Sequence, residues 1–106
     1  MEMVNRSAIV VRPGQPFLDW LHRVDPTSAQ LTLEVLRRAP TIYLLPEWGT
    51  EEEALKHLAE VSSEIFEEQL NGWYRVPSVW FEDRELNAFL RWFDCSFHSM
   101  VFDVCD

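Results

Sequence analysis

The pattern of apolar and polar positions in the first half of the chain predicts two strands, with a helix after the first. The β-branched run 7–12 is stopped by Pro13-Gly14 and indicates a strand. Apolar residues then recur with helical spacing between Pro16, which suits the first turn of a helix, and Asp25-Pro26, which ends it. A short apolar run at 41–45, closed by a proline, predicts a buried second strand.

The segment 31–39 fits either a strand or a helix. Apolar and polar residues alternate from Leu31 to Val35, as they would in a strand. The same segment is rich in good helix formers, and Arg37-Arg38 would lie at the negative end of a helix dipole. We therefore expect a short helix here, with a strand as the alternative.

A long helix over about 51–70 is the clearest element of the sequence. Thr50 followed by Glu53 forms a capping box, and Asn71-Gly72 is a typical helix stop. Most residues along one face of this helix are apolar, and glutamates lie mainly on the other.

The last third of the chain predicts an irregular segment, a helix and a terminal strand. Residues 73–81 are aromatic and interrupted by Pro77, and Asp83 can cap a helix whose apolar residues extend to Phe93. Alternation then predicts a strand over 98–104. The residues of this strand that we expect to face the core are His98, Met100, Phe102 and Val104.

These elements together predict one α+β domain over residues 1–106, with the order β-α-α-β-α-α-β. Three strands would form one small sheet, packed with about four helices in two layers. The connection between the first two strands contains helix, so a right-handed parallel crossover is the default arrangement for that pair. The position and direction of the third strand stay open.

Composition adds that the chain can build one core and carries no sign of a membrane span. Apolar residues make up 47% of it, including five Trp and seven Phe. The sequence does not open with a basic segment followed by an apolar run, as a secretory signal would. An apolar run such as 42–45 is far shorter than the roughly 18 residues that suggest a span. We therefore expect a soluble, cytoplasmic protein.

The charge of the chain bears on its partners. Eighteen acidic residues against nine basic ones give a formal net charge of −9. That excess disfavours direct binding of DNA or RNA, which requires clustered Lys and Arg. It leans instead towards basic protein partners.

Several segments resemble a family of small uncharacterised bacterial proteins. They are 15–21, 43–47, 65–68, 92–93 and 97–103, and the last, Phe-His-Ser-Met-Val-Phe-Asp, is the most specific. The resemblance covers most of the chain. It implies a bacterial, cytoplasmic origin and a compact α+β domain. The family has no assigned activity, so no functional residues carry over.

Two groups of residues invite a metal-binding interpretation. Cys95, His98 and Cys105 include the spacing Cys-x-x-His, which can be half of a zinc site. A zinc site usually has two ligand pairs, and a strand between the cysteines would hold them about 30 Å apart. The second group shares one face of the long helix and consists of Glu53, His57, Glu60 and Glu64. A di-iron site would need ligands from further helices, so a solvated face is expected. We expect two free thiols, no metal site and no cofactor.

No arrangement of residues predicts catalysis. The sequence has no Gly-x-Ser-x-Gly motif, and each of its three glycines fits a turn, a loop or a helix stop rather than a phosphate-binding loop. We therefore assign no catalytic residue.

Aromatic residues in or beside loops are the candidates for binding. They are Trp48, Trp73, Tyr74 and Trp80. Such residues are typical of protein interfaces and pocket walls, although they can also simply cover the core.

Three hypotheses follow. The leading one is a non-enzymatic, acidic protein-interaction module, which could also self-associate. The second is a small-molecule-binding protein or small enzyme with a pocket near 73–81 and His98. The third is a nucleic-acid mimic whose glutamates bind a basic protein.

Overall fold

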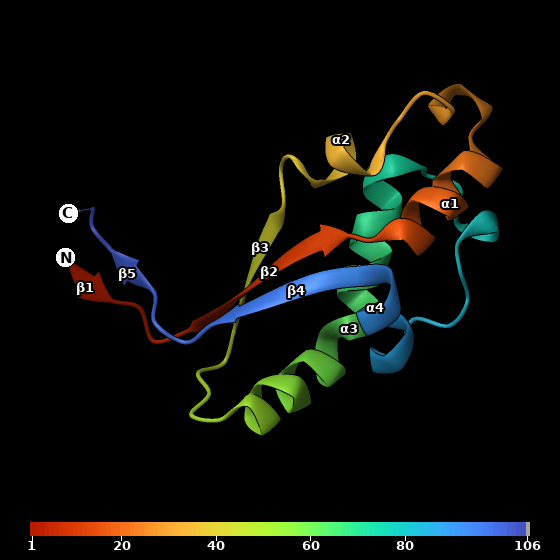
Figure 1. Ribbon diagram of the computed structural model, residues 1–106. Helices are drawn as coiled ribbons and strands as arrows, with labels where there is room; N and C mark the ends of the chain where they lie inside the picture. Colours follow the sequence, from red (N-terminus) through yellow and green to blue (C-terminus); the bar gives the residue numbers. More distant parts are fainter. Residues whose placement is uncertain (106) are drawn as a thin grey trace.

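The chain folds as an α+β domain in which a three-stranded sheet packs against helices, and both chain ends leave the sheet together as an arm (Figure 1). The structure is a computed structural model and describes residues 1–105. The helices are α1 (Gln15–Val24), α2 (Leu33–Arg37), α3 (Glu51–Trp73) and α4 (Leu86–Trp92), with short 3₁₀ turns at Pro26–Ser28 and Pro77–Val79. The strands are β1 (Glu2–Met3), β2 (Ser7–Pro13), β3 (Thr41–Leu45), β4 (Phe93–His98) and β5 (Phe102–Asp103).

The three-stranded sheet has the order β3-β2-β4, and both of its pairings are antiparallel. The expected parallel crossover between the first two predicted strands is therefore wrong. Ser7 pairs with Leu45 and Val11 with Thr41, so β3 returns alongside β2 in the opposite direction. The helices between them lie at one end of the sheet, and from there the chain re-enters it as a neighbouring antiparallel strand.

The expected terminal strand lies earlier than its alternation indicated. Phe93, expected on the last helix, begins β4, and β4 ends at His98. It pairs with the other side of β2, from Pro13 opposite Phe93 to Ala8 opposite His98. The side chains expected to face the core from 98–104 are all exposed instead.

The arm is the pair of short strands β1 and β5, and β1 was not expected from the sequence. Met3 pairs with Phe102 and Glu2 with Asp103. Two chain segments connect the pairing of β1 with β5 to the pairing of β2 with β4. The N-terminal segment has four residues (4–7), and the C-terminal segment has three (99–101). One extra residue on one strand bends and twists a ladder, as a β-bulge does, which accounts for the arm leaving the plane of the sheet.

The first helices form where the sequence predicted them. Gly14 is the N-cap of α1 and a proline occupies its first turn, while Asp25 ends it. The ambiguous segment 31–39 contains the helix α2, with Thr32 accepting a hydrogen bond from Val35 N and Arg37 in the last turn. The strand alternative for this segment is thus excluded.

The ends of the later helices differ from expectation. At the start of α3, Thr50 Oγ1 accepts from Glu53 N at 3.2 Å, but Glu53 accepts from Gly49 N rather than from Thr50 N, so only half of the capping box forms. The expected stop at Asn71-Gly72 is wrong, because α3 continues to Trp73 with no residue of positive φ. Asp83 accepts from Glu85 N instead of capping α4, which begins at Leu86.

The core is a cluster of aromatic rings between the inner sheet face and the helices. Phe66 of α3 has no exposed surface, and its ring centroid lies between 5.1 and 6.2 Å from those of four other aromatic residues. These neighbours are Phe81, Phe89, Trp92 and Phe93. Trp20 is also buried, and its Nε1 donates to Val79 O at 2.9 Å, so its polar atom is satisfied.

Candidate interaction surfaces

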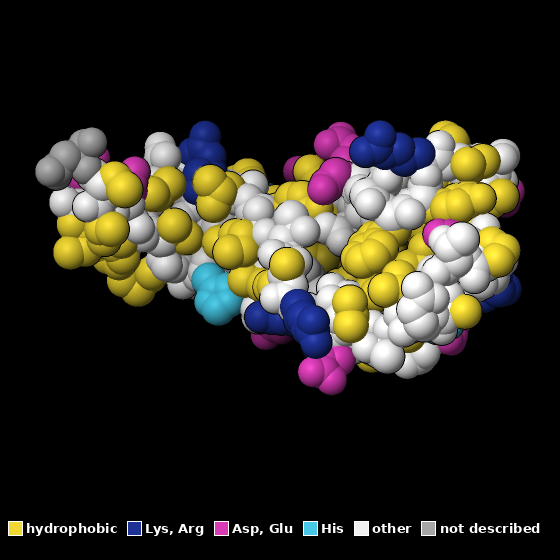
Figure 2. Space-filling model, turned by 90° about the horizontal axis from the view of Figure 1, so that it is seen from above, with side chains coloured by type: hydrophobic (Ala, Val, Ile, Leu, Met, Phe, Trp, Pro, Cys, Tyr) yellow, Lys and Arg dark blue, Asp and Glu magenta, His cyan; other side chains and the backbone are white. Residues whose placement is uncertain are grey.

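Large apolar side chains are exposed on the two strands of the arm and on the residues beside these strands. The exposed fractions are 80% for Met1, 56% for Met3, 65% for Met100, 49% for Phe102 and 70% for Val104. Figure 2 shows hydrophobic side chains gathered over the end of the molecule at the left, where the arm lies in Figure 1. A solvated two-stranded ribbon is marginal by itself, so this apolar surface contributes little to folding.

The two ladder pairs of the arm differ in chemistry. Met3 lies directly opposite Phe102, and Glu2 directly opposite Asp103. Successive side chains of a strand point to opposite faces, so one face of the ribbon is apolar and the other carries two like charges side by side. The arm is therefore an amphipathic ribbon.

The outer face of the sheet near β3 is also apolar. Register places Tyr43 beside Ile9 on the inner face, and places Ile42 and Leu44 beside Val10 and Ala8 on the outer face. Ile42 is 62% exposed and Leu44 56%. The edge strand β3 thus exposes two large aliphatic side chains to solvent.

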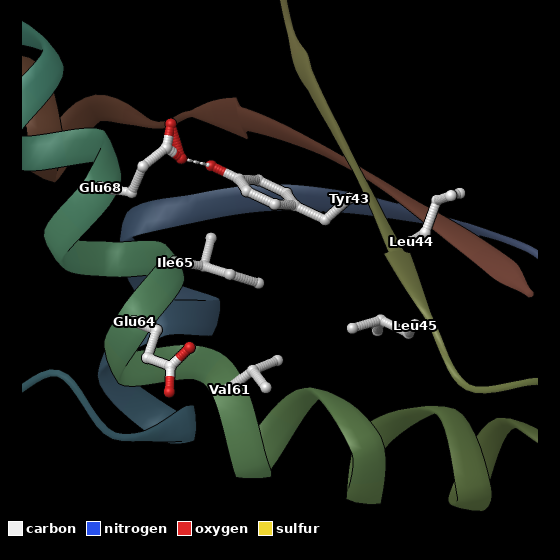
Figure 3. A pocket seen from close by; sticks show the side chains of 7 residues that line it. All are labelled: Tyr43, Leu44, Leu45, Val61, Glu64, Ile65 and Glu68. Carbon is white, nitrogen blue, oxygen red and sulfur yellow. Dashed lines mark hydrogen bonds between the residues drawn. The ribbon is translucent and has the colours of Figure 1, made fainter.

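A groove lies between β3 and α3, with a volume of about 320 Å³. It is lined by Tyr43, Leu44, Leu45, Val61, Glu64, Ile65 and Glu68, of which Leu44 directs its side chain away from α3 (Figure 3). Figure 3 shows Val61 and Ile65 of α3 and Leu45 of β3 pointing between the two elements, with both glutamates on the helix side. The groove thus has apolar walls and two carboxylates. We call it the β3–α3 groove.

One end of the β3–α3 groove is held by hydrogen bonds. The Tyr43 hydroxyl donates to a Glu68 carboxylate oxygen, as Figure 3 shows. The buried Gln69 Nε2 donates to Thr41 Oγ1 and to Tyr43 Oη, both at 2.9 Å. Burial, and then the bond to Glu68, raise the pKa of Tyr43 well above its usual range. Tyr43 is therefore a neutral donor at ordinary pH, and it fixes the orientation of Glu68.

The aromatic residues singled out from the sequence lie mostly against the core. Trp48 is half-buried, with its ring edge-on to Phe97 at a centroid distance of 5.8 Å. Trp80 is also half-buried, and its Nε1 donates to Tyr74 O at 2.8 Å. Trp73, the last residue of α3, is 38% exposed. These residues do not form one surface patch, since Trp48 packs on β4 and the others lie at the end of α3 or after it.

His98 lies at the end of β4 and is exposed, with its Nε2 3.0 Å from Ser96 Oγ. The groove on the opposite edge strand includes neither His98 nor any residue of 73–81, where the sequence suggested a pocket. The β3–α3 groove therefore lies apart from the residues of the second hypothesis.

The two cysteines are free, and they differ in environment. Cys95 is half-buried on the inner face of β4, where burial, and then the charge of Asp94, raise its pKa to about 11. Its thiol is therefore protonated and weakly nucleophilic at neutral pH. Cys105 is exposed on the arm. Among residues 1–105, no group of three or more His, Cys, Asp or Glu side chains is placed to hold a metal ion.

The β3–α3 groove and the apolar arm were not found by sequence reasoning. Both depend on how distant strands are arranged. The local signals were the apolar run 41–45 for the groove and the alternation over 98–104 for the arm. No helix in the part of the chain that the structure describes is long and apolar enough to cross a membrane. Comparisons with family models, curated proteins and solved structures found no match. The resemblance to small bacterial proteins therefore stays a prediction.

Proposed function

We propose that this protein is a non-enzymatic protein-interaction module that docks onto a partner through the apolar face of its β1–β5 arm. The observation that carries the proposal is the exposure of Met3 and Phe102, which are paired on a ribbon that projects from the body. Contiguous exposed apolar surface rimmed by polar groups is characteristic of protein interaction sites.

Folding of the arm has an entropic cost that burial of its apolar side chains by a partner would offset. Ordering two strands reduces the conformational entropy of each residue involved, at about 1–2 kcal/mol per residue. In the arm this cost is met by few hydrogen bonds and little burial. A partner that covered Met3 and Phe102 would remove their apolar area from water, at about 25 cal/mol per Å². Binding would thus stabilise the arm, and the arm would supply the anchor side chains.

The proposed setting is a bacterial cytoplasm. This rests on the resemblance to small bacterial proteins and on two thiols that are not joined in a disulfide. The aromatic residues Trp73, Tyr74 and Trp80 belong to the segment at and after the end of α3, which lies away from the arm in Figure 1, so they are not part of this interface.

Affinity capture from a bacterial lysate, with quantitative mass spectrometry, tests the proposal by comparing two double variants. Met3→Ser with Phe102→Ser removes the apolar pair of the arm. Val76→Ser with Leu90→Ser removes two side chains of similar exposure, 43% and 41%, elsewhere on the surface. Recovery of specific partners should fall about tenfold or more for the arm variant only.

Two results would contradict the proposal. One is an arm variant that retains every partner of the wild type. The other is equal loss of partners by both variants, which would indicate general surface stickiness rather than docking through the arm. Thermal unfolding of both variants verifies that each is folded.

A further inference from the structure

The strand β3 has one open edge. Within residues 1–105 it pairs only with β2, so its other edge has no strand neighbour. Alternate residues of an antiparallel edge strand direct N–H and C=O groups away from their neighbour. The edge of β3 is not shielded by charged side chains of its own, because Thr41–Leu45 contains none. An extended chain can therefore hydrogen-bond there.

The side chains beside this edge differ between the two faces of the sheet. On the outer face an added strand would lie next to Ile42 and Leu44, which are 62% and 56% exposed. On the inner face it would border the β3–α3 groove, with Val61 and Ile65 as apolar walls. The surface is therefore complementary to an extended segment whose two faces carry different kinds of side chain.

The carboxylates determine the chemistry of the inner face. Glu64 and Glu68 lie one helical turn apart along α3, and both line the groove. Glu68 is oriented by the Tyr43 hydroxyl, and a carboxylate that accepts one hydrogen bond retains acceptor sites for a cation. A Lys or Arg side chain can place its aliphatic stem against Val61 and Ile65 and its charge beside the two carboxylates.

We propose that the open edge of β3 binds an extended segment of a partner protein as an added strand, whose side chains alternate between apolar residues and Lys or Arg. The apolar residues cover Ile42 and Leu44, and the basic ones enter the β3–α3 groove. Main-chain hydrogen bonds to β3 hold the segment, and the alternation sets its register.

A second copy of the chain is a poorer occupant of this edge. Pairing two β3 strands would bring Glu64 and Glu68 of both copies into one neighbourhood, and each copy carries a net charge of −9. Like charges held together oppose association, whereas a basic segment removes the repulsion already present in the groove.

This inference rests on the proposed role as an interaction module but concerns a different surface. The arm is built from β1 and β5, and the groove from β3 and α3. If the peptide below does not bind while the arm variant still loses its partners, only the groove inference fails. If the peptide binds and the arm variant retains its partners, only the arm proposal fails.

Fluorescence anisotropy with the full chain tests the inference directly. The probe is a labelled peptide, Ser-Val-Lys-Val-Arg-Val-Lys-Ser, and its control has Glu in place of each Lys and Arg. At physiological ionic strength the basic peptide should bind at least tenfold more tightly than the acidic one. Failure of the basic peptide to bind, or equal binding of the two, would overturn the inference.

Matched variants separate the groove from the general charge of the protein. Glu64→Gln with Glu68→Gln removes the two groove carboxylates and keeps an acceptor for Tyr43. Glu51→Gln with Glu52→Gln removes the same charge from the first turn of α3, whose residues do not line the groove. The groove pair should weaken peptide binding about tenfold and the other pair less than twofold. If both pairs of substitutions weakened peptide binding equally, the peptide would be held by the general negative charge of the protein, and the proposed site would be refuted.

Strand addition itself has two specific readouts. Two peptides, N-methylated at one or the other alternate set of backbone nitrogens, should differ, because only one edge of an added strand faces β3. Amide exchange should slow at 42–45 when the unmodified peptide binds. Equal binding of both methylated peptides, or slowed exchange confined to β4, would refute addition at β3. If the protein formed concentration-dependent dimers that slowed amide exchange in β3 without peptide, a second copy would occupy the edge. That result would also refute the proposal.

Discussion

The β2–β4 pairing and the β1–β5 arm are successive parts of the same two chain segments, yet they differ in what stabilises them. Where β4 runs beside β2, Phe93 lies under Phe66 and Phe89, and all three are essentially buried. A few residues farther along the same ribbon, Phe102 pairs only with Met3 and is 49% exposed. The helices of the second layer reach the first region and stop short of the second. A β-ribbon with apolar side chains thus becomes a core only where another layer covers it.

The largest expected effect is on the core side of this comparison. Phe66→Ala should reduce the free energy of unfolding by about 3–5 kcal/mol, because it leaves a cavity among four aromatic rings. Phe102→Ala should change it by about 0.5 kcal/mol or less. Urea denaturation monitored by tryptophan fluorescence measures both. Similar losses for the two variants would mean that the arm is part of the cooperative core.

An intermediate effect is expected where the ribbon leaves the core. Trp48 packs edge-on against Phe97 of β4 and is half-buried, so Trp48→Ala should cost about 2 kcal/mol of stability. Trp73→Ala, at the exposed end of α3, serves as the control and should cost about 1 kcal/mol or less. If Trp48→Ala leaves the denaturation midpoint unchanged but weakens association, Trp48 belongs to an interface, as one interpretation of the sequence has it.

The smallest expected effect is on the arm itself. Glu2 and Asp103 lie directly opposite one another, and like charges in that position destabilise an antiparallel pair. Glu2→Lys should stabilise the arm by about 0.5 kcal/mol and slow the exchange of its amides about twofold. Glu52→Lys makes the same charge change on α3 and should leave arm exchange unaltered. If the amides of the arm exchanged faster in Glu2→Lys than in the wild type, Glu2 would not lie opposite Asp103 in solution.

Local patterns in the sequence predicted most elements, because each depends on neighbours within one or two turns. Pro16 in the first turn of α1 and Thr50 at the N-cap of α3 are examples in which a nearby backbone requirement decides the residue. The assignment of Phe93 to the last helix was wrong because its spacing fits both the helix before it and the strand after it. The predicted helix stop at Asn71-Gly72 was wrong because α3 continues to Trp73. The residues that follow, Tyr74 and Trp80, pack on the core.

The candidate sites were less predictable, since they depend on partners distant in the chain. Alternation over 98–104 predicted one strand facing the core, but the structure has only the end of β4 and the short β5 there, and the expected inward side chains are exposed. Alternation does not say whether a protein core or solvent lies beside an apolar face. The β3–α3 groove joins Leu45 with Glu64 and Glu68, and it lies at an edge because the sheet order is β3-β2-β4. Strand order depends on long-range packing, which the periodicity of one segment does not contain.

The side-by-side position of the chain ends has a mechanical consequence. Tension applied to both ends would load the antiparallel ladder from its tip, so the pairs would separate one after another rather than shear together. Glu2 and Asp103 would part first, then Met3 and Phe102, before force reached the pairing of β2 with β4. Unzipping in this direction requires little force at any moment. Pulling residues 2 and 103 apart would therefore detach the arm before it strained the pairing of β2 with β4.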